Sequence, residues 1–143
     1  MTAQNVMTAR QIVLTEADFD RLTSLVESPK YRATHAVLIA ALRDELEHAK
    51  VVESGKVPRG VVTMHSKVRI RDLAIDETET YTLVYPEEAN IDEGKLSVLA
   101  PLGTALLGTK QGQIVAFDAP AGQRRLKIEK VVYQPEAAGD LHL

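Results

Sequence analysis

The hydrophobic period of the chain changes from about 3.6 residues to two near its middle, and this change restricts the possible folds. In the first part, apolar residues recur at helical spacing, as Phe19, Leu22 and Val26 do. In the second part, apolar and basic residues alternate, as in the segment 67–71. Residues 51–60 lie between the two parts and contain two glycines and a proline, which is typical of a linker. The pattern therefore predicts an α+β protein with helices first and a sheet second.

The helical part is predicted to be an antiparallel hairpin, a short coiled coil. Thr15 caps the first helix, with Asp18 at the acidic position of a capping box. Ser28-Pro29 ends this helix, and a second helix is expected from Tyr31 to Lys50. The run 36–42 is apolar on nearly all sides, so we expect it to pack on the other domain or on a partner as well. The seam between the helices should consist of Phe19, Leu22, Ile39, Leu42 and Leu46.

The second part is predicted to be an antiparallel sheet with one short helix. Alternation marks strands near residues 64–71, 78–85, 113–117 and 126–133, and Pro101 and Gly108 bound the helix. The expected divisions are a disordered N-terminus 1–10, a hairpin 11–50, a linker 51–60, a sheet domain 61–134 and a tail 135–143.

Composition excludes several classes of protein. The 143-residue chain has no cysteine, which rules out disulfides, a thiolate nucleophile and cysteine metal sites. Its longest apolar run has seven residues, against about 20 for a membrane-spanning helix. The polar segment 1–10 does not resemble a secretion signal, so we expect a cytoplasmic protein. The net charge of −3 gives no support for nucleic-acid binding and favours a protein partner.

Candidate chemical motifs are incomplete. Asp44 or Glu45 could share a metal ion with His48 on one helix face, but the first helix carries no histidine. The pairs Gly55-Lys56 and Gly94-Lys95 lack the second glycine and the Ser or Thr of a phosphate-binding loop. No Gly-x-Ser-x-Gly segment is present. We predict no catalytic residue, metal site or cofactor.

Several segments of the second part resemble a known family. The segment 96–108, Leu-Ser-Val-Leu-Ala-Pro-Leu-Gly-Thr-Ala-Leu-Leu-Gly, resembles the C-terminal domain of the bacterial Gre transcript-cleavage factors. The segments 61–66, 83–86 and 133–140 are similar to the regulator of nucleoside diphosphate kinase, a Gre-related family. The resemblance covers most of residues 61–140 and is weaker in the hairpin.

The resemblance implies an FKBP-like C-terminal domain that docks at the rim of the secondary channel of bacterial RNA polymerase. By position, the docking residues would be Ala100, Pro101 and Leu102, with Ala100 replacing a serine of the Gre factors. The hairpin would enter the channel in possible competition with Gre factors, and any DNA contact would be indirect, through polymerase. The family name implies regulation of nucleoside diphosphate kinase, with no kinase activity in this chain.

The hairpin tip departs from the Gre pattern. Gre factors carry two acidic residues there that hold a magnesium ion for RNA cleavage. Here Glu27 is followed by the tip residues Pro29, Lys30, Tyr31 and Arg32, without a second acid. The first helix, with ten to twelve residues, should be only about 15–18 Å long. We therefore predict a polymerase-binding regulator without cleavage activity. The alternatives are a Gre-like cleavage factor and a generic protein-interaction module.

Overall fold

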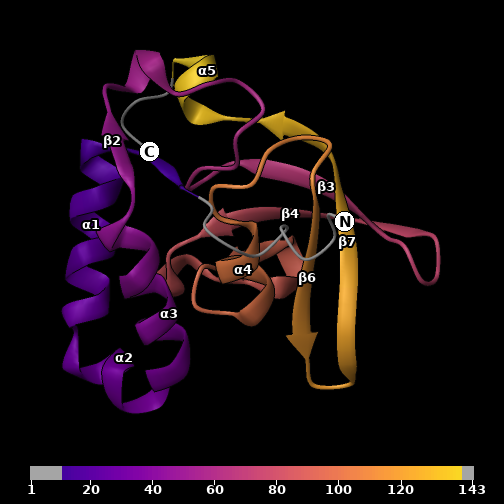
Figure 1. The fold of residues 1–143 in the computed structure, drawn as a ribbon, viewed down its shortest axis with the longest axis horizontal. Coiled ribbons are helices and arrows are strands. Elements are labelled where there is room, and N and C mark those ends of the chain that lie inside the picture. The colour runs from indigo at the N-terminus through magenta and orange to yellow at the C-terminus, as the bar shows by residue number, and fades with distance from the viewer. Residues whose placement is uncertain (1–10, 140–143) are drawn as a thin grey trace.

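The computed structural model describes residues 11–139, and the predicted disorder of residues 1–10 lies outside this range. A short parallel ribbon of two strands closes the helical part at its base (Figure 1). Val13 pairs with Lys50 at one end of this ribbon, and Thr15 pairs with Val52 at the other. In chain order the elements are β1 (Val13–Thr15), α1 (Glu16–Glu27), α2 (Pro29–Thr34), α3 (Ala36–Glu47) and β2 (Lys50–Val52).

The first helix follows the prediction at both ends. The Thr15 hydroxyl accepts a hydrogen bond from the Asp18 backbone N–H at 3.2 Å, so Thr15 is the N-cap. The helix ends at Ser28, directly before Pro29. With twelve residues it is about 18 Å long. The predicted length of the first helix, ten to twelve residues, is thus confirmed.

The predicted single helix from Tyr31 to Lys50 is wrong, because it is broken at His35. The backbone of His35 has φ −132° and ψ 42°, outside the helical region, and separates α2 from α3. The Thr34 hydroxyl bonds to the Lys30 carbonyl and lies 2.7 Å from His35 Nδ1, so local side-chain contacts accompany the break. After α3, the Lys50 N–H donates to the Ile12 carbonyl, where β2 begins. This strand occupies the last residue of the predicted helix and the first two of the predicted linker.

The second part is a five-stranded curled sheet, and the α+β fold class is confirmed. Its strands lie in the order β5-β4-β3-β7-β6, antiparallel except for the parallel pair of β4 and the short edge strand β5. Helix α4 lies inside the curve of the sheet, and α5 follows β7 within the predicted tail (Figure 1). The bounds are β3 (Lys67–Asp72), β4 (Glu77–Val84), β5 (Lys95–Ser97), α4 (Pro101–Leu106), β6 (Ile114–Ala119), β7 (Gly122–Tyr133) and α5 (Pro135–Ala138). Within residues 11–139, the 3₁₀ turns are η2 (Ser54–Lys56), η3 (Pro86–Glu88) and η4 (Ile91–Glu93).

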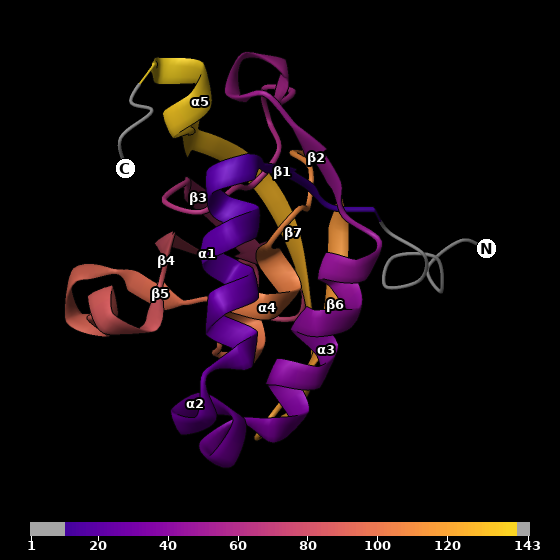
Figure 2. The same cartoon turned by 90° about the vertical axis from the view of Figure 1, so that its left-hand side faces the viewer.

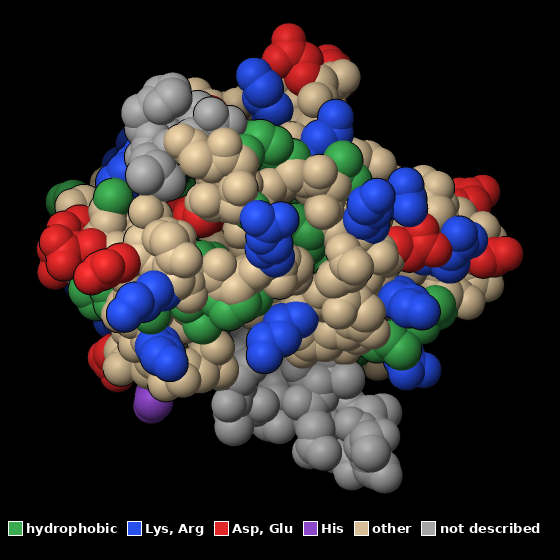
Figure 3. All heavy atoms as spheres, turned by 90° about the horizontal axis from the view of Figure 1, so that it is seen from above, with side chains coloured by type: hydrophobic (Ala, Val, Ile, Leu, Met, Phe, Trp, Pro, Cys, Tyr) green, Lys and Arg blue, Asp and Glu red, His purple; other side chains and the backbone are tan. Residues whose placement is uncertain are grey.

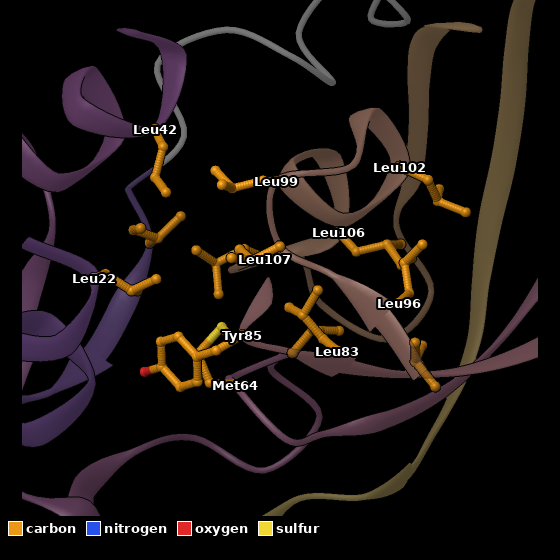
Figure 4. Close-up of a cluster of buried hydrophobic side chains, with 14 of the residues drawn as sticks. Leu22, Leu42, Met64, Leu83, Tyr85, Leu96, Leu99, Leu102, Leu106 and Leu107 are labelled. Carbon is orange, nitrogen blue, oxygen red and sulfur yellow. The ribbon is translucent and has the colours of Figure 1, made fainter. Parts of the chain in front are cut away.

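One hydrophobic core joins the two parts. Figure 2 shows α1 and α3 side by side over one face of the molecule, with α4 behind them. Leu22 and Leu42 of the hairpin point toward Leu99 and Leu107 of the sheet part (Figure 4). All of the predicted seam residues are buried except Phe19, which is half-buried against the core. Helices α1 and α3 of the hairpin are therefore packed on the sheet part, whereas α2 at its tip contributes no buried residue.

Within this core, Gly108 marks a close approach of the two parts. Its φ is +80°, and a Cβ there would lie 2.1 Å from the Ile12 side chain. Only glycine meets both demands. Within residues 11–139, no helix has the length and apolar character needed to cross a bilayer.

Candidate functional site

The hairpin tip presents cations on a single exposed turn of helix. Pro29, Lys30 and Arg32 of α2 are exposed, whereas Tyr31 is half-buried. The Lys30 ammonium lies 5.2 Å from the centre of the Tyr31 ring, within the range of a cation–π contact. The Tyr31 ring in turn meets the His35 ring edge-on at 6.0 Å. The four predicted tip residues are thus together, at the end of the hairpin far from the ribbon (Figure 1).

The tip is anchored by the C-terminal end of α1. The Arg43 guanidinium of α3 donates to the Val26 carbonyl at 3.0 Å, which satisfies a carbonyl that the helix leaves free. The Ser28 N–H donates to the Leu25 carbonyl at 3.1 Å. These bonds fix the position of the turn between α1 and α2, so Lys30 and Arg32 are held on a defined surface.

Carboxylates do not gather at the tip. Glu27 is exposed at the end of α1, and residues 11–139 contain no group of three or more His, Cys, Asp or Glu arranged to hold a metal. The Asp44–His48 pair is an exposed contact of 4.0 Å. The Asp44 backbone carbonyl, followed by its carboxylate, raises the pKa of His48. This geometry is that of a surface ion pair, since two side chains supply too few ligands for a stable metal site.

A groove of about 550 Å³ runs from the tip to the sheet part. Ser28 and Tyr31 line it near the tip, while Tyr85 and Glu87 line its other end. The Arg21 guanidinium carbon stands 3.8 Å above the centre of the Tyr85 ring, between the two ends. The groove therefore follows the surface between α1 and η3, the 3₁₀ turn after β4.

The base of α1 is joined to the sheet part by a buried hydrogen bond. The Tyr85 hydroxyl donates to Asp18 Oδ1 at 3.1 Å, and the two residues are only 2% and 5% exposed. Burial raises the pKa of Asp18 to about 6, with the Tyr85 hydrogen bond opposing this effect. Burial also raises the pKa of Tyr85, so its hydroxyl keeps its proton and remains a donor. Asp18 thus acts as a buried acceptor, in place of the predicted capping-box role.

A second polar contact braces the same junction. The His65 Nε2 atom lies 2.8 Å from Glu88 Oε1, and the same carboxylate oxygen accepts from the Tyr85 N–H at 3.3 Å. The His65 ring is stacked at a tilt on the Tyr85 ring, with centroids 5.6 Å apart. Sequence reasoning missed this cluster because Asp18 and Tyr85 are 67 positions apart. The local signals were an acid in the first turn of a helix and a tyrosine at the end of the predicted strand 78–85, which in the structure is the N-cap of η3.

The predicted docking residues lie where the chain enters α4. Pro101 is exposed, Ala100 is half-buried and caps the helix without a side-chain bond, and Leu102 is only 7% exposed in the core. Pro101 is therefore the side chain among these three that a partner could reach. The next residue, Gly103, has to be glycine, because a Cβ at this position would lie 2.0 Å from the Ser97 carbonyl oxygen. The docking role itself stays a prediction.

Comparisons with known proteins divide the chain where its hydrophobic period changes. Residues 57–133 match the model of the C-terminal domain of the transcription elongation factors GreA and GreB. Residues 10–52 match the model described as Rnk N-terminus. The chain is similar to the regulator of nucleoside diphosphate kinase from Escherichia coli strain K12, with 37% identity over 94% of this chain and 98% of that protein.

Similarity to elongation factors ranges from a partial sequence match to a match over most of both chains. It reaches 37% identity with GreA of Amoebophilus asiaticus, over 63% of this chain and 57% of that protein. Among solved structures, a prokaryotic elongation factor GreA/GreB from Nitrosomonas europaea superposes with a TM-score of 0.69. That match has 36% identity and covers 86% of this chain and 98% of the other.

Proposed function

Since the chain belongs to the family of the regulator of nucleoside diphosphate kinase and contains a GreA/GreB C-terminal domain, we propose that it binds bacterial RNA polymerase and regulates transcription without stimulating transcript cleavage. The sheet part would dock, as an FKBP-like domain, at the rim of the secondary channel. The hairpin would then occupy the channel entrance and compete with Gre factors.

The observation that carries this proposal is the tip. A cleavage factor has to bring a divalent cation to the polymerase active centre, and oxygen ligands are what hold such a cation. The tip instead exposes Lys30 and Arg32. These two positive side chains repel a divalent cation at close range, even with water screening. Glu27 alone does not supply two ligands, and a helix of about 18 Å limits how far Glu27 can reach into the channel.

The junction of the two parts supports a hairpin with a fixed direction. The buried Asp18–Tyr85 hydrogen bond and the shared core hold α1 against the sheet part. A hairpin held in this way presents its tip at one place relative to the docking surface. It can obstruct the channel entrance without extending far inside. An effect on nucleoside diphosphate kinase would follow through transcription in the cytoplasm, since the described residues offer no phosphate-binding loop.

A transcript-cleavage factor is the second candidate, because residues 57–133 match the C-terminal domain of the elongation factors GreA and GreB. Unlike the first candidate, a cleavage factor needs two carboxylates at the tip to hold a magnesium ion. Both candidates bind polymerase, whereas a generic interaction module does not.

Binding and its site can be tested in one experiment. Core RNA polymerase is immobilised, the purified chain is added, and retained protein is measured with rising amounts of GreA. The proposal predicts saturable retention that GreA abolishes, because both proteins would use the same channel rim. Absence of retention, or retention that excess GreA leaves unchanged, would contradict it.

A further inference from the structure

The outward face of the five-stranded sheet is strongly basic, although the chain as a whole carries a net charge of −3. On β3 the inward Val68 and Ile70 are buried, while Lys67, Arg69 and Arg71 alternate with them on the other side. Figure 3 shows Lys and Arg side chains across the middle of this face, with most Asp and Glu toward its margins. The cations of this outward basic face are Lys67, Arg69 and Arg71 of β3 and Arg125, Lys127 and Lys130 of β7.

The strand register places like charges opposite one another. Arg69 pairs with Lys130, and Arg71 pairs with Lys127, across the antiparallel β3–β7 ladder. Directly opposite like charges destabilise a sheet, so this arrangement opposes folding. Such a charge pattern is expected where an anionic partner compensates for it.

One carboxylate orients part of the face without neutralising it. Glu129 sits where the β3–β7 register shifts, and its two oxygens accept from the Nε atoms of Arg69 and Arg71. Asp76 in the β3–β4 turn contacts Arg71 as well. Within residues 11–139, the other four cations have no carboxylate within 4 Å: Lys67, Arg125, Lys127 and Lys130. The face therefore keeps a clear excess of positive charge.

We propose that this outward basic face binds the phosphate backbone of nucleic acid, independently of sequence. Protein interfaces centre on apolar or aromatic side chains and are poor in lysine. The middle of this face instead carries lysines and arginines. The three cations of β3 are paired with threonines on β4: Lys67 with Thr82, Arg69 with Thr80 and Arg71 with Thr78. Threonine hydroxyls and basic side chains are the groups that contact phosphate oxygens. The face runs about 16 Å along β7, comparable to the rise of roughly five phosphates of one strand.

This binding goes beyond the proposed function and requires no polymerase, so the purified full chain can be tested alone. Fluorescence anisotropy is measured with labelled duplex DNA and single-stranded RNA of unrelated sequence. The test variant is Lys127→Glu with Lys130→Glu, which creates attractive pairs with Arg71 and Arg69 and should fold. The matched control is Lys50→Glu with Lys56→Glu, an equal change of charge on exposed residues outside the sheet.

The proposal predicts binding that weakens steeply with salt, and an affinity about tenfold or more lower in the test variant. Its salt slope should also fall by about 2, whereas the control variant should stay near wild type. Lack of binding at low salt, or equal losses in both variants, would overturn the proposal. So would loss of polymerase retention in the test variant without any nucleic-acid binding by wild type, because the face would then serve an acidic protein surface.

Discussion

The hairpin and the curled sheet bury their apolar residues in different ways. The sheet has a filled inward face, with Val68, Ile70, Leu126 and Ile128 each at most 1% exposed. The hairpin buries only its inner seam, since α2 contains no buried residue and Val37 of α3 is 82% exposed. Helices α1 and α3 have only twelve residues each, a length at which isolated helices are marginal. The hairpin therefore depends on the sheet part for its stability, whereas its tip is free to interact.

The largest effect is expected from truncating a hairpin side chain that lies in the core between the two parts. Leu42 of α3 is fully buried and points into the common core (Figure 4). Leu42→Ala should lower the free energy of unfolding by about 2–5 kcal/mol, because it leaves a cavity between the parts. Chemical denaturation measures this. The control is Val37→Ala on the exposed face of the same helix, which should cost less than about 0.5 kcal/mol. Similar small losses in both variants would mean that the seam is not the shared core.

A smaller effect should come from the buried carboxyl at the junction. The pKa of Asp18 is about 6 in the folded protein, against 3.8 ordinarily. The folded state then binds the proton more tightly, so the contribution of Asp18 to stability is fully present below about pH 4. It is lost as the pH rises through about 6. The loss between these limits should be on the order of 2–3 kcal/mol.

Thermal or chemical unfolding across this pH range, with Asp18→Asn as the comparison, checks the sign. The asparagine oxygen still accepts from Tyr85 but does not ionise, so the variant should lack this part of the pH dependence. If wild type gained stability relative to the variant as the pH rose from 4 to 8, the junction would be ionic rather than a neutral hydrogen bond.

The smallest effect on stability is expected at the proposed docking point. Pro101 occupies the first turn of α4, where a missing N–H costs nothing and an acid is favourable. Pro101→Asp should change the free energy of unfolding by less than about 0.5 kcal/mol. It should nevertheless weaken retention on immobilised RNA polymerase. Pro120→Asp, in the exposed β6–β7 turn, is the matched control and should leave retention unchanged. Loss of folding together with binding would leave Pro101 without a docking role.

Local patterns were sufficient to predict much of the fold. The cap at Thr15, the end of α1 before Pro29 and the alternation around Val68 and Ile70 depend on neighbours in sequence, and the structure confirms them. The break at His35 was missed because apolar spacing continues through it. The ribbon of β1 and β2 was missed because three-residue strands carry too short a pattern, and their pairing spans the whole hairpin.

Less of the site could be predicted from sequence. The four tip residues adjoin in the chain, so their proximity follows from the turn itself. The Asp18–Tyr85 bond and the like-charge pairs on the sheet require knowledge of tertiary packing and strand register. Leu102 was predicted as a docking residue next to Pro101, but its side chain lies in the core and is only 7% exposed.

The central claim, that this chain occupies polymerase without cleaving RNA, is tested most directly on backtracked transcription complexes. Stalled complexes are mixed with the protein at several magnesium concentrations, and RNA shortening is followed on a gel while binding is measured in parallel. The account predicts bound protein and no acceleration of shortening, because Lys30 and Arg32 repel a second metal ion and Glu27 has no acidic partner at the tip. Accelerated shortening that disappears in a Glu27→Ala variant would contradict it.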